Sequence, residues 1–476
     1  MFAEKTSFER VYRYKLENGL ELFVAENNSA PLAYVEIAIR GGAVTQTPES
    51  AGLFHLYEHM MFKGNAKYAN ERECTEAMNK LGVSDWNGTT GLDRVNYFFT
   101  IPAESVYDGL EFWSYAVRTP KMDETELKNE KGVVLAEIMG YYTQPGRILF
   151  AGLSKHLFPD YPWQLDSSGI PEVVKNATVE QLKEIQNTYY VPENAAIFVG
   201  GDVNHEQILK YVKKIYGDWK NPKTDVPKIK VPTKNPTNNV KKIVYANPNT
   251  SPHYINVNYI LRGPDGETDQ QDTYGADVWS TLLNDPSGFF ANSLTEEKSL
   301  MIQDSDYTGG YYSTQRASGQ IGFYAAMLPN QALTPVKQAN EFLKTLRQKT
   351  IPRMLQADSF TEDEIKMTVR RMEDAQIYQT ETAEGILASL SGIWASCGAD
   401  YFFDYTKNIS KVTQKDIQDF ISKYILNDSA ILLVSLNPAN FEKYKAEFEK
   451  DGYEILTQEN AYWWGNQKNA LTGENK

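Results

Sequence analysis

The sequence predicts an α+β protein of two homologous domains, in each of which helices cover a β-sheet. Three observations lead to this prediction. The chain has 476 residues, too many for one ordinary core, which favours two domains of roughly 200 or more residues. A helix-and-strand pattern of the first half recurs in the second half. A polar stretch without hydrophobic periodicity separates the two copies.

The repeat rests on two pairs of segments at nearly the same offset. Residues 178–199 align without gaps on residues 413–434, and each segment has the pattern of an amphipathic helix, a polar turn and a buried strand. Residues 123–137 align on residues 361–375. Any two amphipathic helices share part of such a pattern, but two pairs at nearly one offset indicate a diverged tandem duplication.

Apolar runs predict the strands, and a polar stretch predicts the domain boundary. Residues 226–242 are rich in Pro, Lys and Asn, and we expect them to form an extended linker between domains at residues 1–225 and 243–476. The predicted strands are residues 21–26, 34–42 and 96–102 in the first copy, and residues 241–246, 254–263 and 322–328 in the second.

Charge and hydropathy argue against two classes of partner. The formal net charge is −14, whereas a nucleic acid or an anionic membrane requires a basic face. No run of about 18 apolar residues is present, so we expect no transmembrane segment. Two cysteines, Cys74 and Cys397, fit no metal or redox spacing, and two free thiols are favoured over a disulfide.

The cellular compartment stays open. The first ten residues lack the basic and apolar regions of a signal peptide, which predicts a cytoplasmic protein as the sequence stands. A periplasmic or exported protein from which such a segment had been removed would have the same sequence.

Three polar residues share one face of an otherwise apolar predicted helix. The chain has five histidines, and His55 and His59 lie in the segment FHLYEHMMFKG with Glu58 between them. We expect this helix to have Ser50 as its N-cap and to stop at Gly64. Residues three and four positions apart project from the same face of a helix, so the three side chains point the same way.

This H-x-x-E-H pattern favours a zinc site. Burying a carboxylate and two imidazoles is unfavourable without a strong partner, and a divalent zinc ion is such a partner. The intervening Glu58 can then act on a water molecule that the metal activates. The alternative is a helix whose histidines make hydrogen bonds inside the core.

A third metal ligand is expected from the helix that follows Asp123. Asp123 and Glu126 have the spacing of a helix start, and Glu130 and Glu137 lie two turns apart on one face. The apolar residues around Glu137 favour it as the ligand. Glu130, nearer the polar start, is expected to hold a ligand side chain in place. The alternative for Glu130 is an ordinary solvated helix residue.

Around these motifs the sequence resembles the M16 family of zinc peptidases, the inverzincins, which include pitrilysin, insulin-degrading enzyme and mitochondrial processing peptidase. Residues 55–65 and 129–138 carry the resemblance, which extends over residues 16–43 and 189–203 and is weaker in the second copy. It implies the short form of the family. There, each of two domains has a mixed sheet with helices packed on one face, and the chains pair to enclose a chamber.

The resemblance implies a role for each candidate residue. His55, His59 and Glu137 would bind one zinc ion per chain. Glu58 would be the catalytic general base, and Glu130 a supporting catalytic carboxylate. The same three ligands suit other divalent metals, so zinc is inferred from the resemblance.

Asn87 would bind substrate, because it matches an edge strand that pairs with the peptide backbone in the family. The family usually has Asn-Ala at this place, whereas this chain has Asn87 followed by Gly88. The alternative is that Asn87 is a turn residue.

The second copy lacks the metal residues. Val278 and Leu282 stand at the positions of His55 and His59, and Ala375 stands opposite the third predicted ligand. We therefore expect no metal site in the second domain.

The second copy also lacks a substrate clamp that the family often carries there. Thr295 and Ile302 replace its arginine and tyrosine, and neither can supply their contacts. Tyr311, Tyr312 and Arg316 lie nearby but at a different spacing.

These features predict a zinc metallopeptidase that hydrolyses peptides or unfolded polypeptides. The missing clamp predicts a heterodimer, in which this chain carries the zinc and a second M16-like subunit supplies the arginine and tyrosine. A homodimer or a monomer with a diverged clamp is the alternative assembly. A non-catalytic M16-like structural or assembly subunit is the alternative function, against which the complete motif argues.

Overall fold

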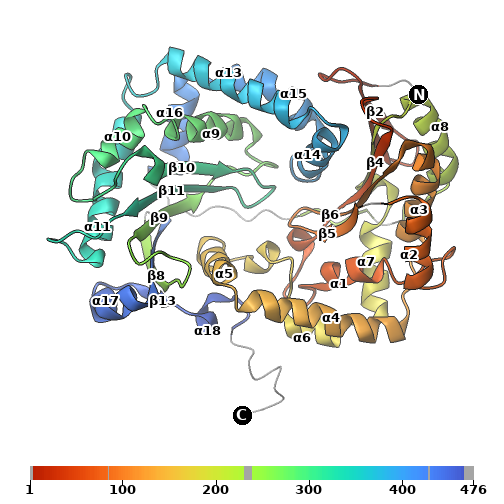
Figure 1. Ribbon diagram of the computed structural model, residues 1–476, viewed down its shortest axis with the longest axis horizontal. Coiled ribbons are helices and arrows are strands. Elements are labelled where there is room, and N and C mark those ends of the chain that lie inside the picture. Colours follow the sequence, from red (N-terminus) through yellow and green to blue (C-terminus); the bar gives the residue numbers. More distant parts are fainter. Residues whose placement is uncertain (1–3, 84, 224, 230–238, 427–428, 466–476) are drawn as a thin grey trace, which may run out of the picture.

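The strands form two mixed sheets, one in each half of the chain (Figure 1). The computed structural model describes residues 4–83, 85–223, 225–229, 239–426 and 429–465. The first sheet contains β1 (Glu4–Lys5), β2 (Val11–Lys15), β3 (Glu21–Glu26), β4 (Leu32–Arg40), β5 (Asp85–Thr90), β6 (Arg94–Pro102) and β7 (Ala195–Gly201). The second contains β8 (Val240–Ala246), β9 (Ile255–Arg262), β10 (Thr308–Ser313), β11 (Gln320–Met327), β12 (Ala430–Leu436) and β13 (Glu454–Leu456).

The two sheets share one strand order over five strands. The order is β3-β7-β4-β6-β5 in the first sheet and β8-β12-β9-β11-β10 in the second. In both sheets the first pair is parallel and the next three pairs are antiparallel. Each of the six predicted strands overlaps an observed one. The predicted α+β fold of two homologous domains is confirmed.

Helices pack on one face of each sheet and bury the two main cores. The first half has α1 (Leu53–Met60), α2 (Glu71–Lys80), α3 (Val106–Arg118), α4 (Glu124–Tyr142), α5 (Pro145–Leu157), α6 (Pro171–Asn176), α7 (Val179–Tyr189) and α8 (His205–Tyr216). The second half has α9 (Gln270–Leu283), α10 (Phe289–Thr295), α11 (Pro335–Thr345), α12 (Ile351–Met354), α13 (Glu362–Gln379), α14 (Ala383–Ser396), α15 (Ala399–Ile409), α16 (Gln414–Tyr424), α17 (Pro438–Lys450) and α18 (Gln458–Ala461). The repeat relates α4 to α13, α5 to α14 and α7 to α16.

Each half also contributes a helix to the opposite sheet. Helices α14 and α15 of the second half cover the other face of the first sheet (Figure 1). Leu387, Leu390 and Trp394 are fully buried there. Helix α5 of the first half packs against β12 and β13 of the second sheet. Because α5 and α14 are equivalent in the repeat, the two halves exchange the same helix.

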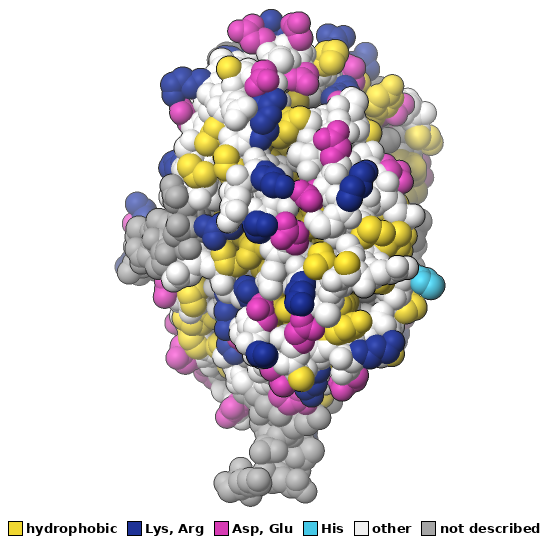
Figure 2. Space-filling view, turned by 90° about the vertical axis from the view of Figure 1, so that its left-hand side faces the viewer, with side chains coloured by type: hydrophobic (Ala, Val, Ile, Leu, Met, Phe, Trp, Pro, Cys, Tyr) yellow, Lys and Arg dark blue, Asp and Glu magenta, His cyan; other side chains and the backbone are white. Residues whose placement is uncertain are grey.

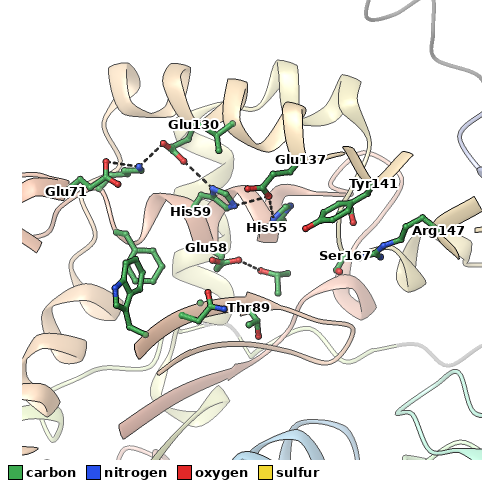
Figure 3. A pocket seen from close by; sticks show the side chains of 18 residues that line it. His55, Glu58, His59, Glu71, Thr89, Glu130, Glu137, Tyr141, Arg147 and Ser167 are labelled. Atoms are coloured by element: carbon green, nitrogen blue, oxygen red, sulfur yellow. Dashed lines mark hydrogen bonds and ion pairs between the residues drawn. The ribbon is translucent and has the colours of Figure 1, made fainter. Parts of the chain in front are cut away.

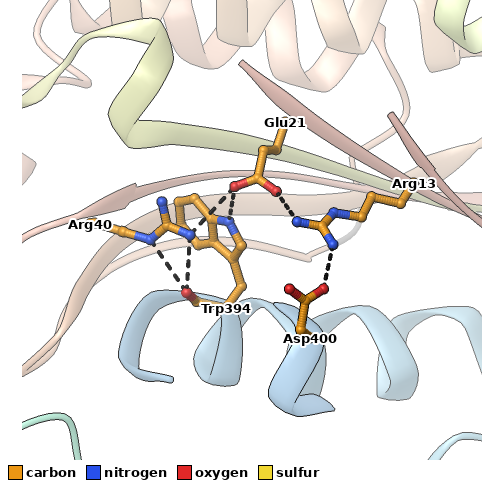
Figure 4. A network of polar contacts seen from close by, with 5 residues as sticks. All are labelled: Arg13, Glu21, Arg40, Trp394 and Asp400. Atoms are coloured by element: carbon orange, nitrogen blue, oxygen red, sulfur yellow. Dashed lines mark hydrogen bonds and ion pairs between the residues drawn. The ribbon is translucent and has the colours of Figure 1, made fainter. Parts of the chain in front are cut away.

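A polar network joins α14 and α15 to the first sheet (Figure 4). Glu21 of β3 accepts a hydrogen bond from Nε1 of Trp394 at 2.8 Å and forms ion pairs with Arg13 and Arg40. The Arg40 guanidinium carbon lies 3.9 Å from the centre of the Trp394 ring, and Arg13 reaches Asp400 at 2.6 Å. Specific contacts between residues far apart in the chain therefore hold the exchanged helices in place.

The predicted linker is only partly described. Residues 230–238 lie outside the described residues, and β8 begins at Val240, so residues 240–242 belong to the second sheet rather than to a linker. Lys241 and Lys242 suggested a polar linker, but they occupy the partly exposed start of a strand that pairs with β12. The domain limits at residues 225 and 243 stay predictions.

Two further predictions from the sequence concern the cysteines and membrane-spanning helices. Cys74 and Cys397 are both free, as predicted. Within the described residues, no helix combines the length and the apolar character needed to cross a bilayer. Figure 2 shows one face of the molecule, on which acidic and basic side chains are interspersed.

Candidate metal centre

Helix α1 begins at Leu53 and has Gly52 as its N-cap, so the prediction of Ser50 as N-cap was wrong. Gly52 has a φ of 101°, in the left-handed region that favours glycine. Its N–H donates to Gln46 Oε1 at 2.7 Å, and a Cβ on Gly169 would clash with its Cα. The helix therefore starts where two glycine backbones approach closely, which sets the direction of its first turn.

Helix α1 ends at Met60, before the predicted stop at Gly64, and a turn fills the interval. Nearly all of its side chains are buried, as predicted. Polar side chains on such a helix need partners. Helix α4 supplies them, and Asp123 caps its start by accepting hydrogen bonds from the N–H groups of Thr125 and Glu126.

The two histidines of α1 and Glu137 of α4 converge on one point (Figure 3). Nε2 of His55 lies 3.4 Å from Oε2 of Glu137, and Nε2 of His59 lies 3.6 Å from the same oxygen. Zinc ligands at about 2.0–2.2 Å in a tetrahedral arrangement lie roughly 3.3–3.6 Å apart. The type of the three donor atoms and the two distances to Glu137 therefore fit a divalent metal.

Glu130 holds the His59 ring through its other nitrogen. Oε2 of Glu130 lies 3.2 Å from Nδ1 of His59, and Oε1 lies 2.8 Å from the ammonium of Lys63, which also pairs with Glu71 at 2.9 Å. The Glu130 side chain is 8% exposed, whereas the Glu137 side chain is 37% exposed. Glu130 is therefore the more buried of the two carboxylates, because His59 and Lys63 supply it with partners.

Glu58 faces the edge strand β5, where its Oε2 accepts a hydrogen bond from Oγ1 of Thr90 at 3.3 Å. Burial raises the pKa of Glu58 to about 7, and the neighbouring His59 partly offsets this rise. Burial lowers the pKa of His55 to about 4, which keeps the ring neutral as a ligand must be. A Cβ on Gly88 would lie 2.7 Å from Oε1 of Glu58, so the glycine leaves room for this carboxylate.

These residues line a cavity of about 590 Å³ between α4 and β5 (Figure 3). Asn87 lies in β5, at the edge of the first sheet, and is exposed beside the cavity rather than placed in a turn. Figure 3 places Tyr141, Arg147 and Ser167 at the end opposite Glu71. The sequence analysis missed these three residues, because no motif marks them. The one available signal was that Tyr141 lies one helical turn after Glu137 and so shares its face of α4.

Two family descriptions match this chain. Residues 22–166 match the description of the insulinase family, peptidase family M16, and residues 176–372 match that of the peptidase M16 inactive domain. The two matches span most of the chain. The chain belongs to peptidase family M16.

Relatives of this M16 chain include named zinc proteases. It is 27% identical over 209 residues to the uncharacterized zinc protease YmxG of Bacillus subtilis, a match covering 44% of this chain and 50% of YmxG. It is 25% identical over 205 residues to the mitochondrial-processing peptidase subunit beta of Dictyostelium discoideum, covering 43% of each. The chain thus spans about half the length of YmxG and somewhat less than half the length of the Dictyostelium subunit.

Solved M16 structures share the fold. The crystal structure of a protease from Helicobacter pylori superimposes with a TM-score of 0.72 at 18% identity, covering 90% of this chain and 100% of that chain. An M16-like peptidase from Alicyclobacillus acidocaldarius superimposes with a TM-score of 0.74 at 16% identity, covering 92% and 100%. At these identities the likeness shows the two-domain fold.

The second M16 domain keeps the helices but not the metal residues. Val278 and Leu282 of α9 are buried in the second core, and Ala375 of α13 is exposed. Among the described residues, the His, Cys, Asp and Glu side chains that lie close enough together to hold a metal are His55, Glu58 and His59 of α1, with Glu137 of α4 beside the two histidines, and none of them belongs to the second half.

The clamp positions of the second M16 domain carry side chains with other contacts. Thr295 ends α10, and Ile302 is buried in the second core. The hydroxyls of Tyr311 and Tyr312 and the guanidinium of Arg316 have hydrogen-bond partners within the second half. Neither clamp position therefore carries an arginine or a tyrosine, and Tyr311, Tyr312 and Arg316 are engaged in other contacts.

Proposed function

We propose that this chain is a zinc endopeptidase that hydrolyses peptides or unfolded polypeptides. The convergence of Nε2 of His55, Nε2 of His59 and Oε2 of Glu137 carries the proposal. These three residues would hold the ion. When bound, it supplies Lewis acidity toward a water molecule and the scissile carbonyl. The relatives named zinc proteases support this assignment.

Glu58 is the group that moves the proton. Its carboxylate lies in the cavity beside His55 and His59, and burial brings its pKa near neutrality. A general base with such a pKa accepts a proton from the attacking water and then donates it to the leaving amine. Thr90 orients one carboxylate oxygen, and Gly88 leaves space for the other.

Two further residues position the reacting groups. Glu130 holds Nδ1 of His59 and thereby keeps Nε2 free to act as a ligand. Strand β5 is a sheet edge and offers its backbone groups to an extended peptide, and Asn87 contacts that peptide from the same strand. The cavity between β5 and α4 therefore accommodates an extended chain rather than a folded protein surface.

We further propose that the chain is the zinc-bearing subunit of a heterodimer. Thr295 and Ile302 leave no cation or phenol at the clamp positions of the second domain, so a second M16-like subunit supplies them. One of the relatives is named a beta subunit, which agrees with a divided architecture.

The test is peptide hydrolysis by the purified, zinc-loaded chain, with a pool of unstructured peptides and Glu58→Gln as the matched variant. We expect Glu58→Gln to bind zinc but to lose about 10²–10⁴-fold in turnover relative to the active form. Equal turnover by Glu58→Gln, or failure of the wild-type chain to bind zinc, would contradict the proposal.

The same measurement tests the assembly. Cleavage by the chain alone would exclude an obligate heterodimer. Zinc binding at about one ion per chain without cleavage, followed by cleavage once a co-purified M16-like subunit is added, is the result expected for a heterodimer.

A further inference from the structure

A second cavity lies in the second half, on helices α9, α13, α14 and α15. Its volume is about 460 Å³, within the range of small-molecule sites. It is lined by residues of α9 and α13, the helices equivalent to α1 and α4, and Ala375, the counterpart of Glu137, is one of them. The half that has lost the metal residues has therefore kept a cavity beside the corresponding helices.

A carboxylate without a cation lines this cavity. Asp277 of α9 is partly buried, and its Oδ2 accepts a hydrogen bond from the hydroxyl of Tyr405 at 2.9 Å. Among the described residues, no Lys, Arg or His forms an ion pair with Asp277. Burial raises the pKa of Asp277 to about 7, and the Tyr405 hydrogen bond offsets only part of that rise. A carboxylate in such a place gains most from a cationic partner.

The other walls complete a site for a cation on an apolar stem. Oε1 of Gln376 is buried without a hydrogen-bond partner among the described residues, so a second acceptor lacks a donor. The rings of Tyr401, Phe402 and Tyr405 line the same cavity, with those of Tyr401 and Tyr405 5.9 Å apart. Aromatic faces attract cations and also cover the methylene groups that carry them.

We propose that this cavity binds an ammonium or guanidinium group on an aliphatic stem, with Asp277 as its counter-ion and Gln376 as a second acceptor. The shared chemistry fits a free alkyl amine and equally the lysine or arginine side chain of a polypeptide. The proposal does not rest on the metal centre, because none of its residues belongs to the first half.

The experiment is ligand titration of the full chain at pH 8, followed by NMR or calorimetry. The probes are butylammonium and Nα-acetyl-lysine methylamide, with butanol and Nα-acetyl-6-hydroxynorleucine methylamide as neutral counterparts of the same shape. We expect saturable binding of at least one cation, weakened at least about tenfold in Asp277→Asn and in the neutral counterparts. Binding of butylammonium alone identifies a free-amine site, and binding of the lysine derivative identifies a side-chain site.

Two further variants keep the test decisive. Asp404→Asn removes the same charge from an exposed carboxylate on α15 and should leave the affinity unchanged. Ala375→Trp fills the cavity from an exposed position and should weaken binding even if Asp277→Asn fails to fold. Absence of saturable binding by both cations overturns the proposal. The proposal is also overturned if Asp277→Asn binds the cation as tightly as the wild-type chain does. The same holds for Ala375→Trp.

Discussion

Helices α1 and α9 occupy equivalent places in the two halves but carry different side chains. At the two positions where α1 has His55 and His59, α9 has Val278 and Leu282, both buried in the second core. The carboxylate of Glu137 on α4 likewise has no counterpart on α13. The strand order around these helices is nevertheless the same.

This difference separates what the fold needs from what the site needs. The same five-strand order forms with either set of side chains, so the polar residues of α1 are not required to build the domain. Buried imidazoles and carboxylates without a partner destabilise a protein. Their presence on only one of two equivalent helices therefore indicates a function rather than a structural requirement.

The largest effect is expected when α1 is given the residues of α9. His55→Val combined with His59→Leu removes two of the three ligand atoms, so zinc content should fall from about one ion per chain to none. The metal-free variant should be at least as stable as the metal-free wild-type chain, because apolar side chains replace buried polar ones. Metal analysis measures the zinc content, and urea unfolding measures the stability. Retention of about one zinc ion per chain would show that the two histidines, which α9 lacks, are not the metal ligands.

The exchanged helices should also differ in how much they stabilise the fold. Trp394 of α14 is fully buried and donates to Glu21, so Trp394→Ala should lower the free energy of unfolding by about 3–5 kcal/mol. At the equivalent position of α5, His156 is half-buried and pairs with Glu454 at 3.3 Å. His156→Ala should cost less than about 1 kcal/mol. Equal losses, measured by urea unfolding, would show that the two helices contribute alike.

A pH dependence is expected where the halves meet. Asp93, in the turn after β5, accepts a hydrogen bond from the N–H of Arg316 in the second half. Burial raises the pKa of Asp93 to about 6, so the folded chain holds a proton that the unfolded chain releases near its ordinary pKa. The stability from this group is present at low pH and is lost as pH rises through about 6, by on the order of 2–3 kcal/mol.

The matched variant for this effect is Asp93→Asn, which cannot titrate. The difference in unfolding free energy between the wild-type chain and Asp93→Asn should change between about pH 4 and pH 6 and be constant above that range. A difference that does not vary with pH would show that the pKa of Asp93 is not raised in the folded chain.

The smallest effect is expected at Glu130, which holds the ligand His59 through its other ring nitrogen. Glu130→Gln should weaken zinc affinity by about 10–100-fold, because the amide holds Nδ1 of His59 less strongly than the carboxylate does. Glu124→Gln on the same helix changes an exposed side chain and should leave the affinity unchanged. Competition with a chromogenic chelator measures the zinc affinity of both variants. Equal affinities of Glu130→Gln and the wild-type chain would show that Glu130 pairs with Lys63 without supporting the metal ligands.

Local periodicity allowed the prediction of the part of the site that lies on one helix. His55, Glu58 and His59 share a face because of helix geometry alone, whatever the rest of the chain does. The choice between Glu130 and Glu137 could not be made reliably in this way. It was argued from apolar neighbours in the sequence, whereas burial of Glu130 depends on Lys63, which lies on a different segment.

Helix ends were predicted less well than helix positions. Ser50 has the side chain of an N-cap, but Gly52 takes that place because its backbone packs against Gly169, far along the chain. Similarly, Lys241 and Lys242 suggested a linker but lie in β8. In each case a contact with a distant segment overrode the local preference.

The sequence by itself determined the α+β class, the duplication and the three polar residues of α1, because these depend on periodicity within short segments. Only the tertiary structure decided which carboxylate meets the histidines, which helices the halves exchange, and where Asp277 and Gln376 share a cavity. The physical reason is that these features arise from packing between segments far apart in the chain, which no local pattern records.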